Sequence, residues 1–493
     1  MTLDALRAAH PGFEGEVRVL VHGGTCGHAV GVAPHGGFLR QSAGDACAEA
    51  ACDGACWAAP AATVLRPGHS HRFARLDETG VEPLLTCLAG SCDARADDRG
   101  EREHRGGLMS RLGRTDGTLA GALAAGAYEA AARALAMAPA EVIDAVEAME
   151  LTGRGGAHFP TGQKWCFATG GEPPVLVVNA EEGEPGVFKD RHMLEGDPHR
   201  VIEGMLIAAH ATGATDACVY INGQARRARA AFEHALAEAA EAGILGGDAL
   251  GAAVALTIEV RSGAGGYVCG EETVILNSIE GQRPVPRFKP PQITEAGLFG
   301  RPTLLNNVET LAAATLLFDP PAAPPKLVPL SGAVARPGLY EVAVDGQATW
   351  GSLLEAARGG AHAPPGVGSL LVGGPSGVFV AAEQFDEPLE MAALGAGGLV
   401  ALAPGGEANV TLELARYNAR ESCGECTPCR EGTVRLVELL EAPSLDRPKL
   451  DELIDVITEA SLCQLGGMAG RPIASALATF PQAFSNGAAG AAE

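Results

Sequence analysis

The chain has 493 residues, of which 47% are hydrophobic and only 4% aromatic, and its formal net charge at neutral pH is −24. This length predicts roughly three or four domains, with enough apolar residues for buried cores. A strongly acidic chain lacks the basic surface that binds nucleic acids and anionic membranes, so we exclude both as partners.

No stretch of the sequence holds the roughly 20 uninterrupted apolar residues of a membrane span, and the charged amino-terminal segment does not match a signal peptide. We therefore expect a cytoplasmic protein that is not embedded in a membrane. In a reducing compartment its 13 cysteines are not expected to form disulfides, and we expect that they include ligands of metals or clusters.

The first domain is predicted over residues 1–92. Apolar runs at residues 17–21 and 61–65 predict two strands. The cysteines between these strands are Cys26, Cys47, Cys52 and Cys56. Charged residues dominate the sequence that follows, DARADDRGEREHR, so we expect a solvated linker at residues 93–110.

A glycine-rich stretch at residues 153–165, GRGGAHFPTGQKW, follows a segment with helical periodicity at residues 119–151. Within that segment, Pro139 predicts the start of a second helix. Glycines let the backbone approach a ligand so that its N–H groups face a phosphate, and Arg154 and Lys164 add positive charge. Aromatic rings in the stretch add flat surfaces. The alternative is an ordinary glycine-rich turn.

Strands and helices then alternate, and we assign residues 111–325 to one domain. Strands are predicted at residues 175–178, 217–221 and 254–260, and helices at residues 198–211 and 224–242, the first of them capped by Asp197. This order implies a parallel sheet with helices on both faces and with ligands outside the carboxyl ends of its strands.

Two further stretches combine glycines with carboxylates. NAEEGEPGVFKDR, residues 179–191, leaves the carboxyl end of the first strand, and GAGGYVCGEET occupies residues 263–273. Such carboxylates suit a metal ion, ribose hydroxyls or a solvated turn, and neither stretch alone distinguishes these possibilities.

The remaining chain divides into two parts. After a proline-rich linker at residues 319–325, short strands, a hairpin near residues 330–340 and a helix at residues 350–358 suggest a small β-grasp (ubiquitin-like) domain at residues 326–404, without evident chemistry. Residues 405–493 are predicted to be helical, with a frayed end. The fold class is therefore α/β and multidomain.

The cysteines of the helical part give the strongest local signal. Cys423, Cys426 and Cys429 have the spacing C-x2-C-x2-C, and Cys463 follows 34 residues later, far enough to return from a helical hairpin. Three thiolates in one turn and a distant fourth are typical of a [4Fe-4S] cluster. Zinc is the alternative, although structural zinc sites usually pair their ligands two and two.

Together, five stretches resemble, in the same order, the NADH-binding flavoprotein subunit of respiratory complex I and the related subunits of soluble NAD-reducing hydrogenases and NAD-dependent formate dehydrogenases. They are GRGGAHFPTGQKW, NAEEGEPGVFKDR, GAGGYVCGEET, TLLNNVETL at residues 303–311 and ESCGECTPCREG at residues 421–432. The resemblance implies a Rossmann-like domain that binds FMN and NAD(H), and a C-terminal helical bundle that carries the [4Fe-4S] cluster.

The resemblance also implies residue roles. Positions that contact the flavin correspond to Gly153, Arg154, Gly155, Lys164, Asn179, Glu181, Gly270, Asn306 and Asn307. Positions that hold the nicotinamide nucleotide correspond to Phe159, Phe167, Glu182, Glu184, Tyr267, Glu271 and Glu272. These residue types fit such ligands, because cations pair with phosphate, aromatic rings stack on adenine and carboxylates accept hydrogen bonds from ribose hydroxyls. A carboxylate at the ribose would also repel the 2′-phosphate of NADP, so NAD(H) is the expected nucleotide. No side chain is expected to be a catalytic acid or base, because the flavin carries the chemistry.

Three residues depart from the family pattern. Glu181 stands where relatives have aspartate, Gln292 where they often have an aromatic residue, and His158 where glycine is common. We expect the first change to shift a hydrogen bond to the flavin and the second to remove a stacking surface for adenine. His158 is expected to be a tolerated loop residue.

The first domain is similar to the thioredoxin-like [2Fe-2S] ferredoxin module of these relatives. GTCG at residues 24–27 and CDGACWAAP at residues 52–60 match its cysteine segments and supply Cys26, Cys52 and Cys56. The module needs four ligands, and neither Cys47 nor His22 stands at the family's position for the fourth. We therefore expect that this cluster is lost.

These features predict the diaphorase subunit of a multi-subunit enzyme, with hydride exchange between NAD(H) and FMN and one-electron transfer with the [4Fe-4S] cluster. The fused first domain and GLFGRPT at residues 297–303 resemble the soluble formate dehydrogenase and hydrogenase versions more than the complex I subunit. Of these we favour a cytoplasmic NAD-dependent formate dehydrogenase, with a NAD-reducing hydrogenase as the second candidate and complex I as a further alternative. Expected partners are a thioredoxin-like [2Fe-2S] subunit and a large catalytic subunit. The alternative of another class is a non-catalytic iron–sulfur scaffold without FMN.

Overall fold

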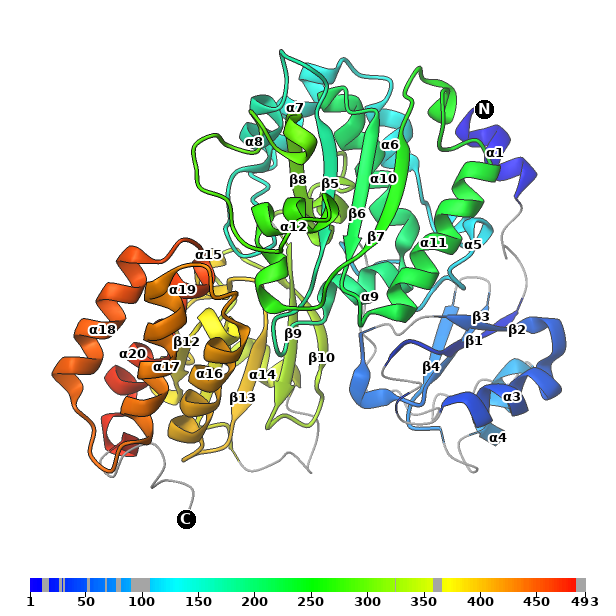
Figure 1. Cartoon of the computed structure of the whole chain (residues 1–493). Coiled ribbons are helices and arrows are strands. Elements are labelled where there is room, and N and C mark those ends of the chain that lie inside the picture. The colour runs from blue at the N-terminus through cyan, green and yellow to red at the C-terminus, as the bar shows by residue number, and fades with distance from the viewer. Residues whose placement is uncertain are drawn as a thin grey trace.

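The structure is a computed structural model, and the residues it describes are 1–10, 17–25, 29, 32–50, 54–66, 69–76, 81–89, 107–323, 325–357 and 366–484. Residues 93–106 of the predicted linker lie outside these ranges, as do Cys26, Cys52 and the predicted frayed end. At the carboxyl end of that predicted linker, Leu108 and Met109 are fully buried rather than solvated, because they pack in the main core. Within the described ranges, three β-sheets and a group of C-terminal helices form a mixed α/β fold (Figure 1).

The first sheet has the strand order β2-β1-β3-β4. Its strands are β1 (Arg18–His22), β2 (Cys47–Ala50), β3 (Ala62–Arg66) and β4 (His69–Phe73), and its helices are α3 (Val32–Ala43) and α4 (Val81–Leu88). β1 and β2 are parallel, and the other two pairs are antiparallel. The strands predicted at residues 17–21 and 61–65 are confirmed as β1 and β3. Cys87 in α4 is disulfide-bonded, contrary to the expectation that the cysteines avoid disulfides.

The second sheet is parallel throughout and has the order β7-β6-β5-β8. Its strands are β5 (Val175–Ala180), β6 (Asp216–Ile221), β7 (Thr257–Ser262) and β8 (Thr303–Asn307). The chain runs outward from β5 to β6 and β7 and then returns to place β8 on the other side of β5. The carboxyl end of β5 is therefore a topological switch point, where open α/β sheets bind ligands.

The three predicted strands of this sheet are confirmed as β5, β6 and β7. β7 begins at Thr257 rather than at residue 254, because its pairing with β6 starts there: Thr257 N donates to Thr215 O at 2.9 Å. β8 was not predicted as a strand, since its short sequence, TLLNN, was interpreted only through the family resemblance.

Both faces of the parallel sheet are buried. Leu176 and Val178 of β5 pack in the same core as the helices α10 (Pro198–Thr212), α11 (Arg226–Glu241) and α13 (Val308–Ala314). Val175 and Val177 point the other way, toward α12 (Glu272–Ile279). Successive side chains of a strand point to opposite faces, so two covered faces require the continuous apolar run that the sequence shows.

The other helices of this part precede the sheet or lie at its edge. They are α5 (Leu119–Ala124), α6 (Glu129–Ala134), α7 (Pro139–Ala148), α8 (Thr161–Phe167) and α9 (Lys189–Gly196). The predicted start at Pro139 is confirmed, and Asp197 caps α10 by accepting from Arg200 N. α1 (Leu3–Ala9) also belongs here, because Leu6 is buried in the same core.

The third sheet is mixed and has the order β10-β9-β13-β11-β12. Its elements are β9 (Pro325–Gly332), β10 (Gly338–Ala343), α14 (Trp350–Ala357), β11 (Ser369–Val372), β12 (Val378–Ala381), α15 (Met391–Leu394) and β13 (Leu399–Leu402). The predicted hairpin and helix are confirmed as β9–β10 and α14. We call residues 325–402 the five-stranded unit.

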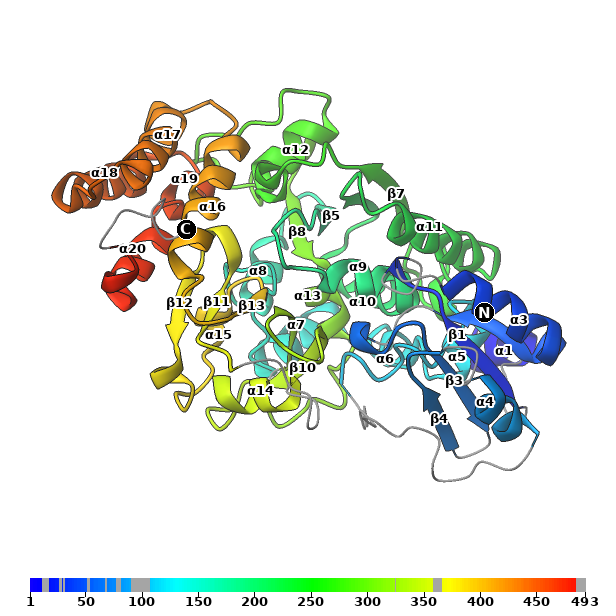
Figure 2. The ribbon, with the colours of Figure 1, turned by 90° about the horizontal axis from the view of Figure 1, so that it is seen from below.

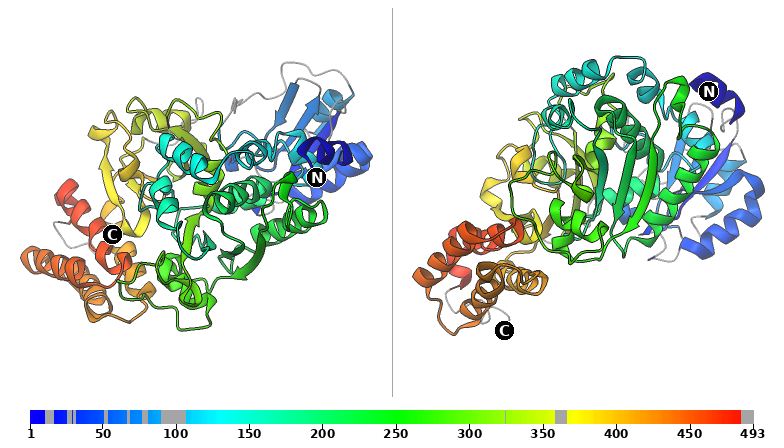
Figure 3. Two further views of the ribbon diagram at one scale, coloured as in Figure 1. Left: turned by 90° about the horizontal axis from the view of Figure 1, so that it is seen from above. Right: turned by 45° about the horizontal axis from the view of Figure 1, so that its top comes forward.

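The C-terminal helices are α16 (Glu407–Glu421), α17 (Thr427–Glu441), α18 (Arg447–Ala460), α19 (Gln464–Met468) and α20 (Arg471–Thr479). They lie at one end of the molecule and the first sheet lies at the opposite end, with the parallel sheet and the five-stranded unit between them (Figures 2 and 3). None of the helices in the described part of the chain is long and apolar enough to cross a membrane.

Candidate functional site

The glycine-rich stretch forms a closed loop between α7 and α8, next to the carboxyl end of β8. Gly153 N donates to Phe159 O at 2.8 Å, and Thr161 N donates to Leu151 O at 2.7 Å. A Cβ atom on Gly155 would lie 3.4 Å from Asn307. His158 has a φ of +52°, a left-handed conformation that glycine adopts more easily, which agrees with the glycine of the family pattern.

Arg154 is the buried cation of this loop. Its side chain has no exposed surface, and its Nη1 donates to Met391 Sδ at 2.8 Å and to Thr152 Oγ1 at 3.4 Å. Its Nε and Nη2 atoms are also buried, but neither has a hydrogen-bond partner in the described part of the chain. Buried donors are almost always paired, so these two point to a ligand with acceptor oxygens, such as a phosphate.

Glu181 lies at the carboxyl end of β5, with one carboxylate oxygen paired and the other unpaired. Oε1 accepts from Asn222 Nδ2 at 2.5 Å, whereas Oε2 is buried and without a partner among the described residues. Gly263 provides the space, because a Cβ atom there would lie 2.1 Å from Oε2. Burial raises the pKa of Glu181 to about 7, although the bond from Asn222 lowers it.

The two following glutamates differ from each other. Both oxygens of Glu182 accept backbone bonds at the start of α9, from Asp190 N at 2.8 Å and from Arg191 N at 3.2 Å. Glu184 Oε1 is buried without a partner among the described residues, and burial raises the pKa of Glu184 to about 8. Glu184 Oε1 can therefore accept a hydrogen bond from a ligand, whereas Glu182 fastens the loop after β5 to the first turn of α9.

The asparagines at the ends of β5 and β8 also differ in whether their side chains already have hydrogen-bond partners. Asn179 Nδ2 donates to Gly270 O at 2.9 Å, which ties the loop after β5 to residues 263–273. Asn307 Nδ2 donates to Asp190 Oδ2 at 2.6 Å, and its Oδ1 accepts from Lys189 Nζ at 3.2 Å. Asn306 Nδ2 is buried and unpaired within the described ranges, so it is the asparagine that faces the site.

The residues predicted to hold the nucleotide surround the same loops. Phe159 and Phe167 are 44% and 63% exposed, and their ring centroids are 6.3 Å apart. Tyr267 OH lies 2.6 Å from Ser376 Oγ of the five-stranded unit. Glu271 caps α12 by accepting from Thr273 N at 2.8 Å.

The charged groups that act on Lys164 are Glu272 and Lys289. Burial lowers the pKa of Lys164, while Glu272 raises it and Lys289 lowers it, and Glu272 forms an ion pair with Lys289. The structure therefore places Lys164 beside a carboxylate on the predicted nucleotide side.

Without bound ligand, the protein is expected to lose stability as the pH rises from about 4.5 toward 8. Unfolded glutamates lose their protons near pH 4.5, whereas folded Glu181 and Glu184 keep theirs up to about pH 7 and 8. Between these values the folded state binds more protons, so raising the pH favours unfolding. One pKa unit corresponds to about 1.4 kcal/mol. The raised pKa of Glu181 alone is therefore expected to lower the free energy of unfolding by on the order of 3 kcal/mol over this pH range.

This prediction is checked by thermal melts of the ligand-free protein at pH 5 to 8.5. The E181Q/E184Q variant is expected to have a flatter dependence of melting temperature on pH, because glutamine does not titrate. E452Q, which alters an exposed residue of α18, serves as the matched control and should keep the slope of the unchanged protein. Equal slopes in all three proteins would contradict the raised pKa values.

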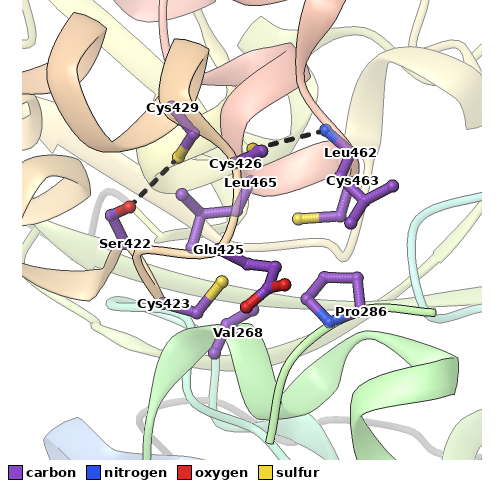
Figure 4. A pocket seen from close by; sticks show the side chains of 10 residues that line it. All are labelled: Val268, Pro286, Ser422, Cys423, Glu425, Cys426, Cys429, Leu462, Cys463 and Leu465. Carbon is purple, nitrogen blue, oxygen red and sulfur yellow. Dashed lines mark hydrogen bonds between the residues drawn. The ribbon is translucent and has the colours of Figure 1, made fainter. Parts of the chain in front are cut away.

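The four cysteines of the C-terminal part line one cavity (Figure 4). Cys423 and Cys426 lie in the loop before α17, Cys429 in its first turn, and Cys463 between α18 and α19. In the described part of the chain, no three cysteine, histidine or acidic side chains are close enough to hold a single metal ion. The four cysteines nevertheless line one common space, and three ligands in one turn with a distant fourth are typical of a [4Fe-4S] cluster.

The cavity is closed by residues of two other segments. Val268 and Pro286 from the parallel-sheet part line it, together with Leu462 and Leu465. Arg283 Nη2 donates to Cys423 O at 3.1 Å, so the loop after α12 is bonded to the cysteine loop. The predicted ligands Cys423, Cys426, Cys429 and Cys463 therefore come together in a largely apolar setting that fits an iron–sulfur cluster.

Two residues of the first-sheet part, Thr25 and Cys56, lie next to α9. Thr25 N donates to Glu195 Oε2 at 2.9 Å, and Cys56 Sγ lies 3.8 Å from His192 Nε2. Since Cys26 and Cys52 lie outside the described residues, the [2Fe-2S] ligand set stays a prediction. Of the two weighed as a fourth ligand, His22 is buried against Thr63 Oγ1 at 2.9 Å, and Cys47 lies in β2.

The sequence analysis missed a buried charged group behind the glycine-rich loop. Lys189, Glu309 and Lys326 have almost no exposed surface, and Lys326 Nζ and Lys189 Nζ lie 2.7 and 3.1 Å from the same Glu309 Oε2. A charged residue inside the apolar-rich stretch TLLNNVETL was the available signal for Glu309. Lys326 gave none, because it follows a proline-rich segment that is typical of a linker.

Comparison with known proteins identifies two family regions in the chain. Residues 146–315 match the Nuo51 FMN-binding domain, and residues 409–487 match the NADH-ubiquinone oxidoreductase-F iron–sulfur binding region. The NADH-quinone oxidoreductase F subunit of Aquifex aeolicus is 38% identical over 379 residues, which cover 72% of this chain and 88% of that protein.

Two further similarities involve hydrogenases. NADP-reducing hydrogenase subunit HndC of Solidesulfovibrio fructosivorans is 35% identical over 387 residues, covering 72% of this chain and 78% of that protein. A chain in the crystal structure of a NAD+-reducing [NiFe]-hydrogenase in the H2-reduced state superposes with a TM-score of 0.66 at 29% identity. That match covers 98% of this chain and 87% of the hydrogenase chain.

Proposed function

Because the chain belongs to the family of the NADH-quinone oxidoreductase F subunits, we propose that it is the diaphorase subunit of a multi-subunit NAD-linked enzyme. Membership makes it an NAD(H)-dependent oxidoreductase subunit with FMN, NAD and a [4Fe-4S] cluster as its cofactors. The chemistry that these groups supply when bound is hydride exchange between NAD(H) and FMN, followed by one-electron transfer with the cluster.

The observation that carries the proposal is the position of the 3₁₀ turn Tyr267–Gly270. At one end, Gly270 O accepts from Asn179 at the switch point of the parallel sheet. In its middle, Val268 lines the cavity of the four cysteines. One turn thus separates the proposed flavin site from the proposed cluster site, a short separation that suits electron transfer between them.

We assign the residues of the flavin site by their unpaired polar atoms. Arg154 faces the phosphate of FMN, and Glu181 and Asn306 offer an acceptor and a donor to the polar edge of its ring system. Gly153, Gly155 and Gly270 allow the backbone to approach. Asn179 and Asn307 act indirectly, because their amides already hold other loops in place.

For the nucleotide, Phe159 and Phe167 stack on adenine, and Glu184 Oε1 accepts from a ribose hydroxyl. Tyr267 adds a further ring on this side. Glu182 and Glu271 position the site by capping α9 and α12. Lys164 and Glu272 provide charged groups at the edge of the nucleotide site.

Two assemblies are candidates for the complete enzyme. We propose a cytoplasmic NAD-dependent formate dehydrogenase, with a thioredoxin-like [2Fe-2S] subunit and a large catalytic subunit as partners. A NAD-reducing hydrogenase is the second candidate, because the similar hydrogenase chain covers 98% of this chain, including the first sheet, whereas the Aquifex aeolicus protein matches 72% of it. Co-purification and identification of the partner subunits distinguishes the two.

We also propose how the chain divides into domains. Residues 1–92 form a thioredoxin-like domain, residues 93–110 a linker, residues 111–325 the Rossmann-like FMN and NADH domain, residues 326–404 a β-grasp domain and residues 405–493 the cluster-bearing bundle. Within this proposal α1 packs on the second domain although it precedes the first. Iron analysis of the isolated first domain tests whether it holds a [2Fe-2S] cluster.

The visible spectrum of the purified chain tests the proposed function. Flavin absorption is expected, together with about four iron atoms per chain, and the flavin bands should bleach within seconds of adding NADH under anaerobic conditions. NADPH is the matched control and should bleach them more slowly. A spectrum with iron–sulfur absorption alone that does not respond to NADH would favour the non-catalytic scaffold and overturn the proposal.

A further inference from the structure

Lys326 lies where the five-stranded unit meets the glycine-rich loop. It is the second residue of β9, and its side chain is fully buried. Its Nζ donates to Glu309 Oε2 at 2.7 Å and to two carbonyl oxygens, those of Arg154 at 3.3 Å and Ala396 at 3.2 Å. An ammonium group has three N–H donors, and all three are used here.

Glu309 is the buried carboxylate nearest to this lysine. Burial raises its pKa, but Lys326, Lys189 and Arg154 together bring the pKa below its ordinary value, so Glu309 is ionised. Its Oε1 accepts from Leu327 N at 2.8 Å, and its Oε2 is shared by Lys326 and Lys189. β9 therefore contributes partners to both oxygens of Glu309.

Arg154 is close enough to Glu309 for their charges to interact, but it forms no hydrogen bond with it in the described structure. The partners of its side chain are Met391 of the five-stranded unit and Thr152, both on Nη1. Its Nε and Nη2 have no hydrogen-bond partner among the residues that the structure describes. A guanidinium next to an ionised carboxylate normally pairs with it, so a competing cation explains why this one does not.

We propose that the five-stranded unit completes the flavin site through Lys326, a positioning residue that occupies Glu309 and so keeps the Arg154 guanidinium available to the phosphate of the ligand. This inference rests on the proposed function, in which Arg154 faces the phosphate of FMN. The phosphate is the only part of FMN that is negatively charged at neutral pH. The unit that showed no chemistry in its sequence thus determines how strongly the phosphate is bound.

The test is fluorescence titration of the flavin-free full-length chain with FMN and with riboflavin, which lacks the phosphate. K326M is expected to weaken FMN binding by about 10- to 100-fold and riboflavin binding by no more than about threefold, because Glu309 then keeps Lys189 but loses Lys326, and its carboxylate also accepts from Arg154. In K326M/E309Q most of the FMN affinity should return, since no carboxylate is left to compete. K449M, on the exposed surface of α18, is the matched control and should change neither affinity.

Two results would overturn the inference: an equal loss of FMN and riboflavin binding in K326M, or FMN binding in K326M/E309Q that is as weak as in K326M. E309Q alone covers the case in which K326M does not fold. It should bind FMN at least as tightly as the unchanged protein, and a tenfold weaker FMN affinity with unchanged riboflavin affinity would also overturn the inference. If the unchanged protein binds no FMN, the proposed function fails instead.

Discussion

The C463S variant is expected to lose its iron–sulfur cluster while keeping its flavin. Cys463 lies between α18 and α19, 34 residues from Cys429, and lines the same cavity as the other three cysteines. A [4Fe-4S] cluster needs four ligands, so iron should fall from about four atoms per chain to less than one. NADH should still bleach the flavin, because the proposed flavin site shares no ligand with the cysteine cavity, but reduction of a one-electron acceptor through the cluster should stop.

The matched control for this variant is C166S. Cys166 is an exposed cysteine of α8 that does not line the cavity. Its replacement removes one thiol and should leave the iron content unchanged. Full iron content in C463S would show that the cluster has another fourth ligand, and loss of FMN along with iron would show that the two sites depend on each other for folding.

The R154M variant is expected to bind FMN about 100- to 10,000-fold more weakly than the unchanged protein, because it loses two charge-assisted hydrogen bonds of about 1.5–3 kcal/mol each. The two donors are Nε and Nη2, which are buried and unpaired among the described residues. Riboflavin has no phosphate, so its affinity should change much less. Fluorescence titration of the flavin-free chain with both ligands measures the difference.

R435M provides the control, because Arg435 is an exposed arginine of α17 that pairs with Glu438 on the same helix. It should leave both affinities unchanged. Equal losses for FMN and riboflavin in R154M would show that Arg154 supports the loop and does not face the phosphate. Melting temperatures of both variants separate loss of a ligand contact from loss of the fold.

The cysteine motif shows how much of the site the sequence could predict. The spacing of Cys423, Cys426 and Cys429 places three ligands in one turn, and the structure brings Cys463 to the same cavity. Local spacing was sufficient here, because three of the ligands are close neighbours in the chain. The sequence could not show that Val268 and Pro286 form the opposite wall, since they come from a different sheet-associated segment.

The carboxylates of the loop after β5 show where prediction from sequence ended. Glu181, Glu182 and Glu184 are almost adjacent in the chain, and the resemblance assigns Glu181 to the flavin and both Glu182 and Glu184 to the nucleotide, but the structure separates the surroundings of all three. Glu182 uses both oxygens on the first turn of α9, whereas Glu181 and Glu184 each have one buried oxygen that finds no partner in the described part of the chain. Which carboxylate faces a ligand depends on the groups that pack against each glutamate in the folded protein. The spacing of the glutamates in the sequence does not reveal that packing.

The sequence by itself determined the family, the order of the parts and the parallel sheet, because apolar runs, glycines and cysteine spacing are local properties of the chain. Only the tertiary structure decided which polar atoms remain unpaired. Lys326, Glu309 and Arg154 are far apart in sequence and meet because the five-stranded unit packs against the glycine-rich loop. Hydrogen bonds between such residues depend on packing across parts of the fold, so no single segment of the sequence could have predicted them.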